Sequence, residues 1–270
     1  MELFKNNQDQ VLRSSSGNIM TRPYDFGNAF VNESDNYIQV NREFSQYLNL
    51  YVWLNMLSGE APRIRIFDSR TVDNNILAGI VTNQVNGYFL VNKNTFSTTG
   101  GTIRVLQRSE TLLTGGLSYG VNLMEINLRD TGFNNGRFNL ATKINFLETR
   151  QNSERIQFFQ FGKYNNEYNT ACNIGRIMLF DRELSDVEYR YLYNNRLGRD
   201  LLSKDGLLLD LHNNRAEILD FSEEQDGSDT RVGVRDFSGN NYHGEIMNLP
   251  AGTLEEQLSY ANVNLFKSFL

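Results

Sequence analysis

The sequence has one cysteine, Cys172, and two histidines, His212 and His243, in 270 residues. A single cysteine excludes an internal disulfide. We interpret Cys172 as a small buried side chain, because a nucleophilic thiol needs a nearby base and the chain has only two histidines. Neither histidine lies in a Gly-x-Ser-x-Gly context, so a Ser–His–Asp triad is not indicated. We expect His243 to be a satisfied turn side chain and His212 to be a surface or rim residue.

Positive charge is also scarce, since 26 lysines and arginines accompany 32 aspartates and glutamates and the formal net charge is −6. Nucleic acid and anionic membrane surfaces are disfavoured as partners, because both require a cationic face. No window approaches the ~18 uncharged apolar residues of a membrane span. The first residues lack the basic and apolar regions of a secretory signal peptide, so we expect synthesis in a cytoplasm.

Short strand-like runs separated by turn residues fill most of the chain. Residues 37–40 alternate between apolar and polar, and residues 48–57 form a long apolar run that contains the only tryptophan, Trp53. Asn-Asn pairs, which favour turns, occur at 6–7, 74–75, 134–135, 165–166, 194–195, 213–214 and 240–241. Further runs lie at 62–67, 77–81, 87–91, 102–106, 121–128, 143–147, 156–161 and 206–211. This pattern predicts an all-β sandwich or barrel.

One short helix is predicted between Ser185 and Asn195. Ser185 is a suitable N-cap, and Glu188 three residues later completes a capping box. Val187, Tyr191 and Leu192 fall on one face of this helix. The pattern of residues 250–270 fits two structures. One is a terminal helix followed by an apolar end that packs on the sandwich, and the other is an arm that attaches to a partner.

Three segments resemble one family. Residues 174–189, followed by 192–194, resemble the last strand and short helix of concanavalin A-like, laminin-G-like jelly-roll domains. Residues 26–40, which end in the pattern D-x-Y-I-x-V, resemble an early strand of that family. Residues 234–246 resemble its hairpin with the pattern D-x-S-G-N-x-x-H-G-x-I. The resemblance implies an antiparallel two-sheet jelly-roll sandwich with one short helix after the closing strand.

The order of these segments departs from the family, in which the hairpin comes first. Either the sandwich is circularly rearranged, with 206–249 completing it, or 206–270 begin a second module. We favour rearrangement, because 206–270 are too few residues for a full sandwich and sandwich termini often lie close together. The expected organisation is an N-terminal arm at 1–23, a laminin-G-like sandwich at 24–249 and a C-terminal tail at 250–270. Residues 206–249 should then pair with strands from 24–200.

The resemblance implies carbohydrate binding, which uses exposed aromatic rings with amide groups beside them. The alternative is that such rings fill the core or cover the sheet faces. The candidate residues are aromatic or amide side chains in or near Asn-rich loops: Tyr88, Tyr119, Tyr164, Tyr168, Tyr242, Asn240 and Asn241.

Calcium is a candidate cofactor, because several families with this sandwich bind it at rim loops through carboxylate and amide oxygens. Asp68, Asp73 and Asn74 form one oxygen-rich loop, and Asp236 lies in another. The alternative, which we favour, is that these side chains cap backbone groups in Asx turns.

No strand presents two acids at alternate positions, as a glycan hydrolase would require. Glu125 is a single acid in its strand, so we expect the protein not to be an enzyme. A carbohydrate-binding or adhesion module and a structural display protein both remain open. A bacteriophage virion surface or appendage protein, such as a head decoration, fibre or tail component, reconciles a lectin-like sandwich with the missing export signal. Its expected partners are other virion proteins, further copies of itself and cell-surface glycans.

Overall fold

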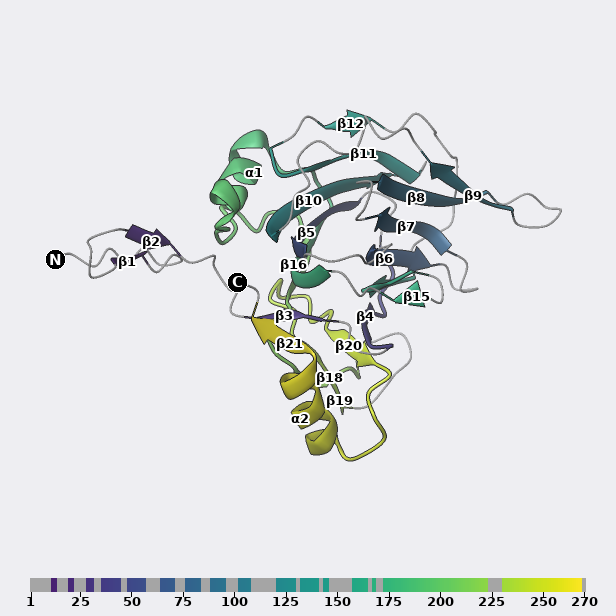
Figure 1. Ribbon diagram of the computed structural model, residues 1–270, viewed down its shortest axis with the longest axis vertical. Coiled ribbons are helices and arrows are strands. Elements are labelled where there is room, and N and C mark those ends of the chain that lie inside the picture. The colour runs from purple at the N-terminus through teal and green to yellow at the C-terminus, as the bar shows by residue number, and fades with distance from the viewer. Residues whose placement is uncertain are drawn as a thin grey trace.

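The protein is an antiparallel β-sandwich with two short helices, as the computed structural model shows (Figure 1). This confirms the predicted fold class, and the second helix lies in the C-terminal segment for which the sequence left two alternatives open. The structure describes residues 11–13, 19–21, 28–31, 35–44, 48–56, 64–70, 76–83, 88–95, 102–107, 120–129, 132–140, 143–145, 157–164, 167–168, 172–222 and 230–268.

The first sheet has eight strands among the described residues, all paired antiparallel. Its order is β12 (Ile144–Asn145), β11 (Gly132–Phe138), β10 (Gly120–Arg129), β5 (Leu48–Met56), β16 (Cys172–Phe180), β3 (Asn28–Phe30) and β21 (Phe266–Ser268), with β17 (Leu207–His212) also paired to β16.

The second sheet has nine described strands, again antiparallel. Its order is β18 (Glu217–Asp220), β19 (Thr230–Val234), β20 (Gly244–Met247), β4 (Tyr37–Val40), β13 (Phe158–Phe161), β6 (Ile64–Arg70), β7 (Ile76–Asn83), β8 (Tyr88–Thr95) and β9 (Thr102–Gln107). Two small hairpins pair only within themselves, β1 (Val11–Arg13) with β2 (Ile19–Thr21) and β14 (Lys163–Tyr164) with β15 (Glu167–Tyr168).

Strand β5 shows how the apolar run near Trp53 is buried on both sides. Leu50, Val52 and Leu54 face the core between the sheets, because alternate side chains of a strand point the same way. Tyr51 and Trp53 point to the opposite face, where they belong to a second apolar cluster. All five are 0% exposed. Full burial of each large apolar side chain contributes roughly 1.5–3 kcal/mol, so both layers stabilise this strand.

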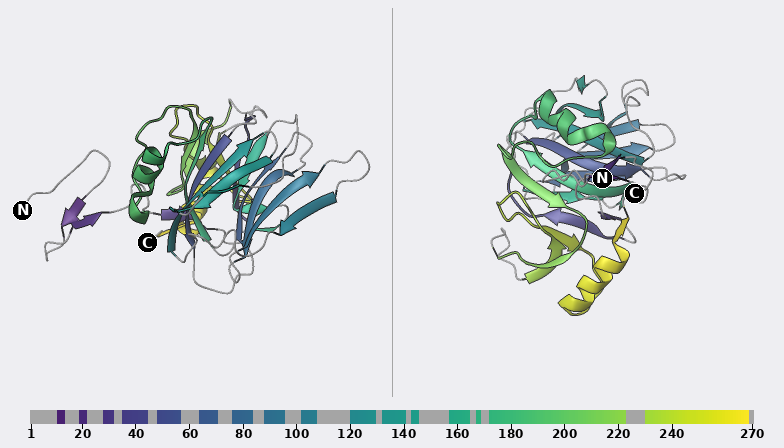
Figure 2. Two further views of the ribbon diagram at one scale, coloured as in Figure 1. Left: turned by 90° about the horizontal axis from the view of Figure 1, so that it is seen from above. Right: turned by 90° about the vertical axis from the view of Figure 1, so that its left-hand side faces the viewer.

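Helix α1 (Asp186–Tyr193) covers that outer face (Figure 2). The predicted capping box is confirmed: Glu188 donates its N–H to Ser185 Oγ at 3.3 Å, and Ser185 donates its N–H to Glu188 Oε2 at 2.8 Å. The buried face differs from the one that the spacing emphasised, since it contains Tyr189, Leu192 and Tyr193. Val187, by contrast, is 70% exposed.

Helix α1 ends at its C-cap Asn194, which has a left-handed backbone with a φ of 39°. A short 3-10 turn, η2 (Asn194–Arg196), follows it. Asparagine tolerates this conformation better than most residues. Asn194 therefore closes the helix one residue before the predicted limit, Asn195.

Residues 206–249 complete both sheets, which confirms the topological prediction. Strand β17 pairs with β16, Leu211 lying opposite Ile177, and β20 pairs with β4, Ile246 lying opposite Ile38. The early and late parts of the chain therefore share one hydrophobic core.

The C-terminal segment packs back on the sandwich. Helix α2 (Leu254–Asn264) leads into β21, which pairs with β3 through Phe266 and Phe30. Ala261 and Leu265 are 0% exposed and belong to the main core. Neither described helix is long and apolar enough to cross a membrane.

Candidate functional site

The sequence-predicted residues fall in several places, and only the loop 235–243 brings some of them together. Tyr119, Asp73 and Asn74 lie outside the described residues. The remaining candidates outside this loop lie on strands of the second sheet or on the small hairpin: Asp68 on β6, Tyr88 on β8, Tyr164 on β14 and Tyr168 on β15.

Tyr242 packs inward. Its ring meets Phe44 edge-on, with 5.9 Å between ring centroids, and the Arg42 guanidinium lies 5.2 Å from its centroid. The side chain is partly buried against the main core. In this structure Tyr242 therefore covers the core, which was the alternative considered for the aromatic residues.

Asp236 organises the loop. Its Oδ1 accepts the backbone N–H groups of Asp210 and Ser238, both at 2.9 Å. Its Oδ2 accepts the Ser238 hydroxyl at 2.7 Å and the Tyr242 N–H at 3.0 Å. A carboxylate has about four acceptor sites, so Asp236 has none left for a metal ion. In the described part of the chain, no group of three or more His, Cys, Asp or Glu residues could hold a metal.

His243 and the two asparagines support the same turn. His243 Nδ1 accepts the Asp236 N–H at 3.2 Å, so His243 is a satisfied turn side chain, as predicted. Burial lowers the pKa of His243 below its ordinary value. The Asn240 side chain donates to the carbonyls of Leu207 and Leu208, at 3.3 and 2.9 Å. Asn241 is exposed and has a φ of 59°.

Phe237 is the residue of this loop that sequence reasoning missed. It is 42% exposed, although it is a large apolar side chain. Its ring stacks on His212, with centroids 4.4 Å apart and an angle of 27° between the planes. Its N–H donates to the Asp210 carbonyl at 2.8 Å. The only local signal was an aromatic residue inside a polar turn, between Asp236 and Ser238.

His212 contacts a buried ionic network formed by Asp210, Arg176 and Asp200. Its Nε2 lies 3.2 Å from Asp210 Oδ1, and its side chain is 9% exposed, so of the surface or rim position that we expected, an open surface position is wrong. Arg176 donates to both oxygens of Asp210, at 2.6 and 2.7 Å, and to Asp200 at 2.9 Å. Burial raises the pKa of Asp210, but the Arg176 charge outweighs it and holds that pKa below its usual range.

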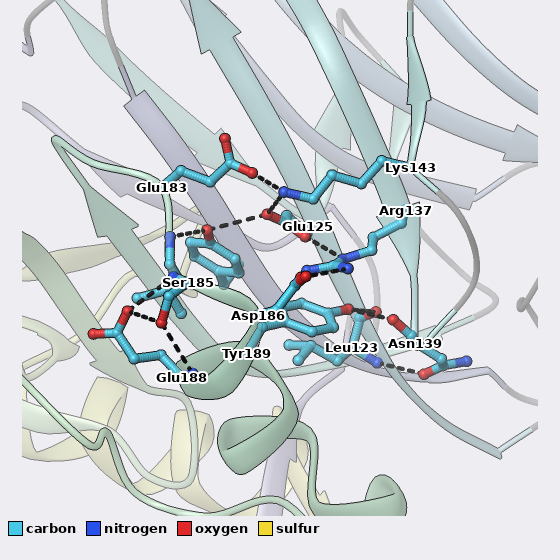
Figure 3. Close-up of polar contacts among 12 residues, drawn as sticks. Leu123, Glu125, Arg137, Asn139, Lys143, Glu183, Ser185, Asp186, Glu188 and Tyr189 are labelled. Carbon is cyan, nitrogen blue, oxygen red and sulfur yellow. Dashed lines mark hydrogen bonds and ion pairs between the residues drawn. The ribbon is translucent and has the colours of Figure 1, made fainter.

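A second buried network lies beneath the start of α1 (Figure 3). Glu125 is 0% exposed and accepts from Arg137 Nε at 2.5 Å and from Tyr51 Oη at 3.2 Å. Lys143 Nζ lies 2.8 Å from the same carboxylate and also pairs with Glu183. The guanidinium of Arg137 lies 3.7 Å from the ring centroid of Tyr189. Burial raises the pKa of Tyr51, so this hydroxyl stays protonated and can donate.

Both glutamates of this network, Glu125 and Glu183, are paired with a cation. Tyr51 Oη accepts the Leu184 N–H at 2.9 Å, which ties the strand to the residues before α1. The Tyr189 hydroxyl donates to the Asn139 carbonyl at 2.7 Å (Figure 3). The Glu125 carboxylate therefore joins strands β5, β10 and β11 to the residues before α1.

No protein-family model matches the chain, and no curated protein matches it in sequence. Solved structures that are similar to it include a pentraxin of Limulus polyphemus, with 10% identity and a TM-score of 0.41 over 67% of this chain and 92% of the other. A galectin of Caenorhabditis elegans has 12% identity and a TM-score of 0.35 over 55% and 95% of the two chains.

A sialidase of Trypanosoma rangeli has 12% identity and a TM-score of 0.38, over 57% of this chain but only 24% of its own length. Structural similarities with sequence identities and TM-scores this low do not assign a function to the chain. The sandwich itself is established by the strand pairing described above.

Proposed function

We propose that this protein is a non-catalytic, carbohydrate-binding β-sandwich whose ligand stacks on Phe237. The observation that supports the proposal is the 42% exposure of that ring while it stacks on His212. Binding sites for small ligands combine apolar and aromatic surface with a few placed polar groups. A sugar ring has an apolar face that suits an aromatic ring and hydroxyls that suit amides. Asn241 of the same loop is exposed and can supply an amide.

The ring is held in place before any ligand arrives. The Phe237 N–H bonds to Asp210, and its carbonyl accepts Lys204 Nζ at 2.9 Å. Asp236, the preceding residue, is fixed by four hydrogen bonds. Ordering a loop on binding costs affinity, so a loop that is already fixed retains more of the contact energy.

The absence of turnover is supported by how the described acids are engaged. Glu125 is bound by Arg137 and Lys143. Asp210 is bound by Arg176, as described above. A hydrogen bond from Arg182, with smaller contributions from Ser185, lowers the pKa of Glu188 to about 2. Asp210 and Glu188, whose pKa values are lowered, are poor proton donors at neutral pH.

Glycan-array binding followed by titration calorimetry tests the proposal. Phe237→Ala should weaken binding of the preferred glycan at least about tenfold, since truncating a central contact residue costs more than about 1.4 kcal/mol. Phe237→Tyr keeps the ring and should keep binding. Leu140→Ala is the matched control, because Leu140 is a comparably exposed apolar residue at 45%. Absence of glycan binding by the wild type, or an unchanged affinity in Phe237→Ala, would refute the proposal.

Turnover is tested separately by incubating the protein with a broad glycan panel and measuring new reducing ends. We expect none. Release of reducing ends that disappears when a single acid is replaced would overturn the non-catalytic part of the proposal.

The virion setting stays a prediction from the sequence. If it is right, mass spectrometry of purified phage particles should detect this chain in stoichiometric amounts. Particles that assemble without it while the chain remains free in the lysate would exclude a virion role.

A further inference from the structure

Lys204 contacts the backbone of Phe237, the residue that carries the exposed ring. Its Nζ donates to the Phe237 carbonyl at 2.9 Å, and its side chain is exposed. An ammonium group has three donors, so at least two remain after this bond. Among the described residues, Lys204 makes no ion pair.

The other basic side chains of this region already have carboxylate partners. Arg215 and Arg235 share Glu217, at 2.7 and 2.6 Å. Arg182 is bound by Glu188 at 2.6 Å. Lys204 differs from these three arginines because no carboxylate of the described residues pairs with its charge.

The acids next to Phe237 and Lys204 in the chain do not neutralise this lysine. Asp236 is buried and its oxygens are filled by four donors. Asp205 follows Lys204 in the chain, but its carboxylate lies 3.5 Å from Arg182 and is 85% exposed. The positive charge next to the Phe237 backbone is therefore exposed to solvent.

Backbone hydrogen bonds hold the turn that carries Lys204. Leu207 donates its N–H to the Lys204 carbonyl at 3.0 Å, and Asp181 donates its N–H to the Gly206 carbonyl at 2.9 Å. Gly206 has a φ of 72°, and a Cβ there would lie 2.3 Å from Asp181 Oδ1. This left-handed backbone favours glycine, because other residues adopt it only with strain. The fold therefore fixes the base of the lysine side chain relative to the loop of Phe237.

From this juxtaposition we infer that the ligand is an acidic glycan that carries a carboxylate, as a uronic acid does. The inference rests on the proposed function, because the sugar ring stacks on Phe237 while its carboxylate accepts from Lys204. The net charge of −6 opposes an anionic ligand only at long range. At physiological ionic strength charges are screened beyond about 8 Å, so the local ammonium decides the contact.

The test compares uronic-acid oligosaccharides with the same oligosaccharides after reduction of their carboxyls to hydroxymethyl groups. The wild type should bind at least one acidic member about tenfold or more tightly than its reduced form, and that preference should shrink as salt is raised. Lys204→Gln should abolish the preference and its salt dependence. Lys204→Arg should retain both. Arg190→Gln, which removes one charge from the exposed side of α1, is the matched control.

The outcomes separate this inference from the proposed function. Equal binding of both forms, or an acidic preference that survives in Lys204→Gln, overturns the carboxylate assignment and leaves carbohydrate binding intact. A Lys204-dependent preference for sulfated over carboxylated oligosaccharides also overturns it. If no oligosaccharide binds, or if Phe237→Ala binds as the wild type does, the proposed function fails together with the inference.

Discussion

Replacing Arg176 by methionine should lower the free energy of unfolding by about 3–5 kcal/mol, because it leaves a buried carboxylate without its cation. Arg176 is 3% exposed and Asp210 is 1% exposed. The guanidinium donates to both oxygens of Asp210, at 2.6 and 2.7 Å. Each hydrogen bond to a charged group contributes about 1.5–3 kcal/mol, so two such bonds account for an effect of this size.

Urea unfolding followed by circular dichroism measures this change. Thermal unfolding gives a second measure. Since 1 kcal/mol shifts the melting temperature of a large domain by about 2–4 °C, we expect the melting temperature to fall by roughly 6–20 °C. Arg190→Met on the exposed side of α1 is the control and should stay within about 0.5 kcal/mol of the wild type. The double variant Arg176→Met, Asp210→Leu should be more stable than Arg176→Met alone, because it removes the unpaired charge. A loss below about 1 kcal/mol, or a double variant no more stable than the single one, would refute this reasoning.

The same pair should make stability depend on pH in acid. The pKa of Asp210 lies below its ordinary value because the Arg176 charge outweighs burial. A depressed folded-state pKa adds stability that is complete above the unfolded value, about 3.9, and is lost as the pH falls through the folded value. Below about pH 4 the wild type should therefore lose stability more steeply than Arg176→Met. Parallel pH curves for the two proteins would contradict the assignment.

Three further changes test other parts of the fold. Ser185→Ala should cost about 1 kcal/mol, because it removes the N-cap of α1; Ser185→Asp should recover most of the loss in the same urea titration. Gly206→Ala should cost about 1–3 kcal/mol, because of its left-handed backbone and the contact with Asp181; an unchanged melting temperature would show that this turn relaxes. Deleting residues 255–270 should unfold the protein, because it removes the buried Leu265 and strand β21. A folded, soluble truncation with native circular dichroism would show that this segment is dispensable.

The local patterns of the sequence were sufficient for much of the fold. The alternation at 37–40 and the run at 48–57 predicted β4 and β5, and both are confirmed. The Ser185–Glu188 capping box predicted the start of α1, because capping involves residues only three positions apart. The placement of 206–249 in the same sandwich was also correct, although it depended on a family resemblance. The glycan, partner and virion predictions remain predictions.

Contacts between distant residues decided what the sequence left open. Arg176 and Asp210 are 34 positions apart, and Tyr51 and Glu125 are 74 apart, so only the register of paired strands brings them together. The same holds for Phe237. An aromatic residue in a polar turn can be buried or exposed. Here the hydrogen bonds to Asp236 fix the loop conformation in which the Phe237 ring stacks on His212 and remains partly exposed to solvent. Composition and periodicity determined that strands form, while the register and stacking of those strands determined which charges are buried and which ring is displayed.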